Sequence, residues 1–80
     1  MITVKLWKKV NSFEPIVNDK LDVDGTVALI AEVQGKTVDE VEEIAMEDLL
    51  PVYLQCVHDV NAEVFKKMAN LPKNGSGDGQ

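Results

Sequence analysis

The chain is poor in the residues that build disulfides, metal sites and catalytic centres. Its 80 residues include a single cysteine, Cys56, and a single histidine, His58. One cysteine cannot form a disulfide within the chain, and one histidine leaves no cluster of zinc ligands. On a helix, Cys56 and His58 would point about 200° apart, so they cannot serve as a nucleophile and its base. We therefore expect a protein that is not an enzyme and that needs no cofactor and no metal.

Long apolar runs are also missing, and acidic residues outnumber basic ones. No run approaches the roughly 20 residues that span a bilayer, and no apolar signal sequence follows Lys8 and Lys9. We therefore expect a cytoplasmic protein without a membrane partner. Residues 21–65 hold eleven carboxylates and one lysine, whereas the residues on either side carry a small excess of lysine. Because an acidic surface repels phosphate backbones, we expect no nucleic-acid partner.

The first residues alternate in polarity, which is typical of a half-buried β-strand. On this interpretation the strand spans Ile2 to Val10, with Trp7 on its polar side. Asn11-Ser12 can form a turn, after which Phe13 to Val17 can return as a second strand. Pro15 donates no hydrogen bond to a sheet, so this second strand would be short or lie at an edge. A single strand and a hairpin both remain open.

Three helices are predicted after a polar connector at residues 18–25. Asp24 is a candidate N-cap for the first helix, because its carboxylate can accept hydrogen bonds from free amides of the next turn. Gly35 is placed to end that helix in a left-handed conformation. Thr37-Val38-Asp39-Glu40 has the pattern of a capping box, so the second helix should begin there.

The third helix is predicted to be the longest. Pro51 is free of strain only in the first turn of a helix, so this helix should begin near Glu47–Asp48 and continue to Met68. The sequence thus predicts an α+β fold: a short N-terminal β-strand or hairpin followed by three α-helices. We expect one small globular domain at residues 1–72. Residues 73–80 are polar and rich in glycine, and we expect them to form a disordered tail.

Apolar residues cover more of the third helix than a core needs. Its apolar arc is roughly 220° wide, against roughly 100–140° for an ordinary surface helix. The central seam of this arc consists of Leu50, Tyr53, Val57, Val60, Val64 and Met68. The arc can serve the core alone, or it can also form an interface with a partner or a second copy; we favour the interface. The expected contact residues are flanks of the arc and one strand residue: Leu49, Val52, Leu54, Phe65 and Trp7.

Residues from Val27 to Phe65 resemble the small tail assembly chaperone family of tailed bacteriophages and prophages. The matching pieces, in chain order, are Ala28-Leu29-Ile30-Ala31, Gly35, Thr37 to Glu43, Glu47-Asp48-Leu49 and the helix after Pro51. A strand or hairpin at the start of the chain is also similar to that family. The chain departs from the family at Pro51, where the family helix normally continues without a proline.

The resemblance implies a non-enzymatic chaperone that acts during tail morphogenesis. Such a protein binds the long, helical tape measure protein through apolar helix surfaces before the tail tube forms around it. It works in the cytoplasm of the bacterial host and is absent from the finished virion. A longer form made by frameshifting would recruit tail tube subunits. Two alternatives remain for the same apolar helix: a homodimeric interaction module or adaptor of a bacterial operon, and a regulatory subunit that offers a surface to a catalytic partner.

Overall fold

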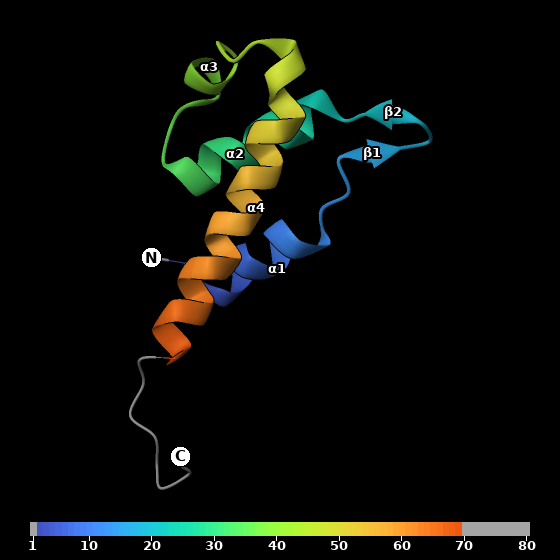
Figure 1. Cartoon of the computed structure of the whole chain (residues 1–80). Helices are drawn as coiled ribbons and strands as arrows, with labels where there is room; N and C mark the ends of the chain where they lie inside the picture. Colours follow the sequence, from blue (N-terminus) through green and yellow to red (C-terminus); the bar gives the residue numbers. More distant parts are fainter. Residues whose placement is uncertain (1, 70–80) are drawn as a thin grey trace, which may run out of the picture.

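A long C-terminal helix supports three shorter helices and a small hairpin in the computed structural model, which describes residues 2–69 (Figure 1). The elements in chain order are α1 (Val4–Ser12), β1 (Ile16–Val17), β2 (Lys20–Leu21), α2 (Val23–Gln34), α3 (Val38–Val41) and α4 (Met46–Ala69). The α+β class and the longest helix at the end are confirmed, but the described part has four helices rather than three. The predicted domain end at residue 72 and the predicted tail at 73–80 lie outside the described residues.

The prediction of an N-terminal strand is wrong, because most of residues 2–10 lie in helix α1. Thr3 is the N-cap, and its hydroxyl accepts a hydrogen bond from the amide of Leu6 at 3.1 Å. The four-residue spacing of Leu6 and Val10 turns both toward the interior, and Val10 is buried. Val4, which the strand interpretation would bury, is 76% exposed. The same apolar residues fit the two-residue period of a strand and the four-residue spacing of one helix face. The Thr3 cap and the packing of that face favour the helix.

A hairpin does occur, but later in the chain than predicted. β1 pairs with β2 in antiparallel register, with Ile16 opposite Leu21 and Val17 opposite Lys20. The two turn residues, Asn18 and Asp19, have φ values of 53° and 63°. Two successive left-handed residues are typical of a type I′ turn, whose twist matches that of the paired strands. Only the end of the predicted second strand is therefore a strand, and it pairs with residues that were assigned to the connector.

Helix α2 begins two residues earlier than predicted. The N-cap is Asp22 and not Asp24, because the Asp22 carboxylate accepts a hydrogen bond from the amide of Gly25 at 3.0 Å. A Cβ on Gly25 would approach that carboxylate to 2.5 Å, so glycine permits the close cap. Gly35 ends the helix at a φ of 68°, which confirms the predicted left-handed position. On the inner side of α2, Ile30 is fully buried.

The predicted capping box is present, although the helix that follows it is only four residues long. The amide of Thr37 donates to the Glu40 carboxylate at 2.8 Å, and the amide of Glu40 donates to the Thr37 hydroxyl at 3.1 Å. Val41 at the end of α3 is buried. Helix α4 begins at Met46, within two residues of the prediction, yet Pro51 lies inside the helix rather than in its first turn. The Glu47 carbonyl therefore receives no hydrogen bond from position 51.

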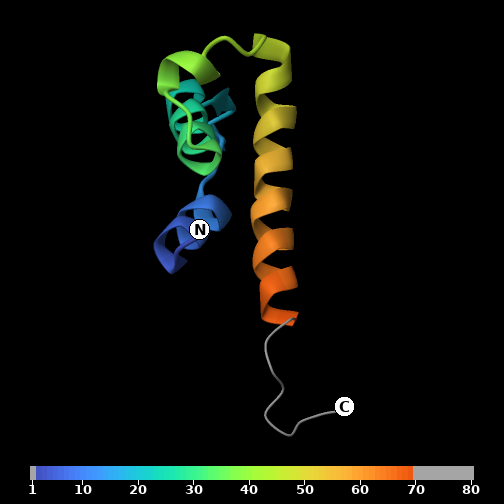
Figure 2. The same cartoon turned by 90° about the vertical axis from the view of Figure 1, so that its left-hand side faces the viewer.

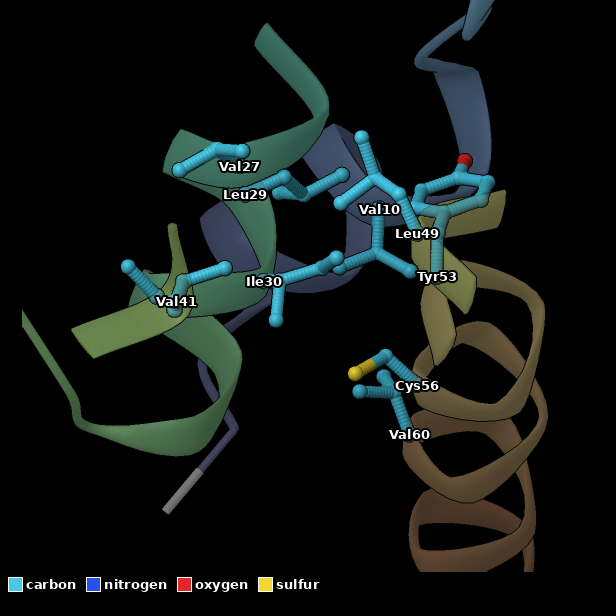
Figure 3. Close-up of a cluster of buried hydrophobic side chains, with 10 residues drawn as sticks. Val10, Val27, Leu29, Ile30, Val41, Leu49, Tyr53, Cys56 and Val60 are labelled. Atoms are coloured by element: carbon cyan, nitrogen blue, oxygen red, sulfur yellow. The ribbon is translucent and has the colours of Figure 1, made fainter. Parts of the chain in front are cut away.

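The core lies where α4 meets α2, with α1 closing one end (Figure 3). The buried residues of α4 are Leu49, Tyr53, Cys56 and Val60, whose spacing of four, three and four residues forms one helix face. Phe13 packs edge-on against Tyr53, with ring centroids 5.7 Å apart. The predicted seam is therefore rotated relative to the true one: it contains Tyr53 and Val60, but it also contains Met68, which is 60% exposed.

Candidate functional site

The predicted contact residues divide into buried and exposed sets. Leu49 is only 3% exposed and belongs to the core, so it drops out of the predicted contact surface. Val52 is partly buried against the core. Leu54 and Phe65 are 57% and 73% exposed, and Trp7 is 39% exposed. Three of the five residues therefore present substantial apolar surface to solvent.

Trp7 and Phe65 line the same groove, although they are far apart in the chain. This groove lies between α1 and the C-terminal half of α4 and has a volume of about 350 Å³. We call it the α1–α4 groove; its lining is Ile2, Thr3, Val4, Trp7, Asn61, Val64, Phe65 and Met68. Leu54 is outside the groove. The structure thus brings together two of the predicted contact residues and separates the third.

A hydrogen-bond network fixes the wall that Trp7 forms. The Trp7 indole N–H donates to the side-chain oxygen of Asn61 at 3.0 Å. The Asn61 amide nitrogen donates to the side-chain oxygen of Asn11 at 2.9 Å and to the Val57 carbonyl at 2.9 Å. The single polar atom of the indole is therefore satisfied inside the protein. What Trp7 offers to a ligand is the apolar part of its ring.

Sequence reasoning missed the other apolar residues of the groove. Ile2 and Val4 were assigned to the inner side of a strand, and Val64 and Met68 were assigned to the core seam. In the structure Val4 begins α1, and Val64 and Met68 follow the last core residue of α4, Val60. The Thr3 cap is the signal that would have found the helix, because a helix starting at Thr3 puts Val4 and Trp7 on one side.

Charge is separated along the long axis of the molecule, which measures 48 Å. The basic end holds Lys5 and Lys8 of α1 and the last-turn residues Lys66 and Lys67 of α4, where Lys67 forms an ion pair with Glu63 at 3.5 Å. At the other end α3 lies beside the start of α4 (Figure 1). That end is acidic: Asp39, Glu40, Glu42, Glu43, Glu47 and Asp48. Folding thus places the α1–α4 groove at the basic end.

The pKa shifts in the described chain come mainly from burial and from local hydrogen bonds. Burial raises the pKa of the Cys56 thiol, and Gln34 contacts its sulfur at 3.4 Å. His58 is exposed and neighbours Asp59 at 3.5 Å. Hydrogen bonds from the backbone and side chain of Thr37 lower the pKa of Glu40. Among residues 2–69, no group of three or more His, Cys, Asp or Glu side chains is placed to hold a metal ion.

No helix in the described part of the chain has the length and apolar character needed to cross a membrane. Comparisons with family models, with curated proteins and with solved structures find no match to this chain. The features of this chain that bear on function are therefore the α1–α4 groove and the sequence pattern of residues 27–65.

Proposed function

We propose that this chain is a non-enzymatic assembly chaperone that holds an amphipathic helix of a client protein in the α1–α4 groove. The observation that carries the proposal is the lining of that groove, in which six of eight residues are apolar. A chaperone of this kind covers an apolar stripe on its client until the client reaches its final partner.

The lining favours a helix over a small-molecule substrate. Pockets for small ligands contain a few polar groups that fix the orientation of the ligand. Among the described residues of this groove the polar side chains are Thr3 and Asn61, and both already make hydrogen bonds within the protein. What remains for a ligand is apolar surface between two helices. A third helix can insert side chains at positions i, i+3 and i+4 into such a surface.

The charge around the groove indicates the polar side of the client helix. Lys8 lies one turn after Val4 on α1, and Lys67 lies beside Val64 and Met68 in the last turn of α4. A client helix with an apolar stripe bordered by Asp or Glu would therefore be attracted to this end of the molecule and repelled by the acidic end. Because these lysines are exposed, their contribution is mainly to orientation and association rate and should weaken with added salt.

The client we propose is the tape measure protein of a tailed phage or prophage, bound in the bacterial cytoplasm and released before the virion is complete. Tail tube subunits are the proposed second partner. The support is the order of elements over residues 27–65: Ala28 to Ala31 lie in α2, Gly35 ends it, the capping box opens α3, and α4 follows. The start of the chain does not support this proposal. A strand or hairpin is expected there from the resemblance, whereas Val4–Ser12 form the helix α1.

The first test measures helix binding by the intact chain. Trp7 is the only tryptophan, so its emission reports on the groove alone. A synthetic amphipathic helix with Leu on one face and Glu on the other should shift this emission to shorter wavelength as it binds. Val4→Ser should weaken binding roughly tenfold, since about 1.4 kcal/mol of apolar contact is lost.

A matched control is Val38→Ser, which changes the exposed first residue of α3 instead of the exposed first residue of α1. It should leave binding unchanged. Equal loss of binding in both variants, or no binding by the unaltered chain, would refute the helix-binding site. The identity of the client is tested separately, by co-expression with the long helix-coding gene nearest to this one. Loss of solubility of that product with Val4→Ser, but not with Val38→Ser, is the expected result.

The homodimeric adaptor gives different results in the same experiments. It predicts a stable dimer in the absence of any client, and it predicts that Val4→Ser has no effect on partner binding. A dimer together with a groove that binds no helix would favour the adaptor over the chaperone.

A further inference from the structure

One side of α4 is left without intramolecular partners along its length. Figure 2 shows the other helices on one side of α4, with its opposite side uncovered. After Glu47 in the first turn, the residues at helical spacing on that opposite side are all exposed: Pro51, Leu54, His58, Ala62, Phe65 and Ala69. We call this the outer face of α4. Five of these six residues are uncharged at every pH, whereas most exposed positions beside them carry charge, which is unusual for a surface that only meets water.

Leu54 and Phe65 make this outer face complementary to itself. They are 11 residues apart, about three helical turns, and therefore lie on the same side of α4. If a second copy of α4 runs in the opposite direction, with the two-fold axis between residues 59 and 60, Leu54 of one copy meets Phe65 of the other. The same contact then occurs twice, once at each end, as a two-fold symmetric interface requires.

The charges of α4 favour the antiparallel direction. Its first turn carries Glu47 and Asp48, and its last turn carries Lys66 and Lys67. In this register the last-turn lysines of each copy lie level with residues 52 and 53 of the other, about five residues from Glu47 and Asp48, whereas parallel pairing puts like charges level with each other. The acidic region around α3 is likewise brought toward the basic end of the second copy. No described element projects from the outer face in Figure 2, so the two copies can approach without obstruction.

We propose that the outer face of α4 is a docking site for α4 of a second copy, which binds antiparallel and forms a symmetric dimer. The interface is small, because it uses one side of one helix. Stable complexes bury about 800 Å² on each partner, so this dimer is expected to be weak and to depend on concentration. The proposal is independent of the client. Phe65 contributes to both surfaces, but Leu54 belongs only to the outer face.

The direct measurement is sedimentation equilibrium of the intact chain over a range of concentrations up to millimolar. The unaltered chain should show a reversible monomer–dimer equilibrium that weakens with added salt. Leu54→Glu should raise the dissociation constant by on the order of 100-fold, because each dimer then contains two apolar contacts replaced by charge. Val17→Glu places the same charge on an exposed valine of β1, away from α3 and from the outer face, and should leave the equilibrium unchanged.

Cross-linking distinguishes the direction of pairing. A mixture of Leu54→Cys and Phe65→Cys should form a disulfide-linked heterodimer under mild oxidation, whereas each variant alone should form much less. Cys56 is buried, so the unaltered chain provides the background. Each variant linking efficiently to itself would indicate parallel pairing and overturn the proposal, as would a chain that stays monomeric throughout. Leu54→Glu should still bind the synthetic helix, so failure of the dimer and failure of the groove are separate results.

Discussion

Replacing Asn61 with alanine should loosen the attachment of α1 to α4. Asn61 is the centre of the network that joins the two helices: it accepts from the Trp7 indole at 3.0 Å and donates to Asn11 at 2.9 Å. It also donates to the Val57 carbonyl one turn earlier at 2.9 Å. Alanine keeps α4 helical, because it has the highest helix propensity of all residues. The variant therefore removes the connection between the helices without a direct cost to either one.

The magnitude follows from the surroundings of these bonds. A typical intramolecular hydrogen bond contributes about 0.5–1.5 kcal/mol net, since water replaces it in the unfolded chain. The two bonds between helices are exposed and lie at the lower end of this range, and the bond to Val57 is partly buried. Asn61→Ala should therefore lower the free energy of unfolding by about 1–2 kcal/mol. In a small domain with about 5 kcal/mol of stability, this is a large fraction.

The assay uses Trp7, the only tryptophan, as a probe of the contact between α1 and α4. In a urea titration of Asn61→Ala, tryptophan emission should move to longer wavelength at a lower urea concentration than the loss of helical circular dichroism. In the unaltered chain the two transitions should lie closer together. Asn11→Ala serves as a graded control, because it removes only one of the three bonds of Asn61. The reasoning is refuted if Asn61→Ala shifts neither the emission nor the urea midpoint.

Three further predictions concern the core, pH and thiol chemistry. Ile30→Ala should destabilise the domain by about 2–5 kcal/mol in urea unfolding. The reason is that Ile30 of α2 is fully buried in the core. Hydrogen bonds from Thr37 lower the pKa of Glu40 in the folded chain. The stabilisation of α3 is therefore complete above the pKa that Glu40 has when unfolded. This stabilisation is lost as pH falls through the lower pKa that Glu40 has in the folded chain. Over that pH range, NMR should show faster exchange of the Thr37 amide in the unaltered chain. Glu40→Gln should show no such change with pH, because it has no carboxylate to protonate. Cys56 should react with thiol reagents only as fast as the domain opens, since burial raises its pKa; rapid labelling of the native chain would contradict this.

Local sequence signals predicted the elements whose ends are determined by nearby residues. Gly35 ends α2 because the left-handed conformation there has no steric cost for glycine. The Thr37–Glu40 box opens α3 because both partners lie within one turn of each other. The start of α4 was found to within two residues. For Gly35 and for the capping box, the deciding hydrogen bonds join residues no more than four apart, so they can be read along the chain.

The N-terminal segment failed for the opposite reason. The apolar residues Ile2, Leu6 and Val10 satisfy both a two-residue and a four-residue period, so periodicity did not decide between strand and helix. The decision depends on the Thr3 cap and on the packing of α1 against α4, where for example Trp7 bonds to Asn61, 54 positions later in the sequence. The hairpin was misplaced because Asn18-Asp19 was interpreted as a connector rather than as a two-residue turn.

Helical periodicity predicted that α4 is a long helix with more apolar surface than a small core can cover, and the composition showed that the chain has few residues of catalytic type. Of the five contact residues that it predicted, Trp7, Leu54 and Phe65 are exposed in the structure, whereas Leu49 and Val52 are buried or partly buried. The division of the apolar arc of α4 between core and surface depends on its neighbours in the fold. The part of the arc that packs against the buried residues of α2 consists of Leu49, Tyr53, Cys56 and Val60. The α1–α4 groove exists only because folding brings α1 beside the end of α4, and the periodicity of a single helix contains no information on which neighbour will cover which side.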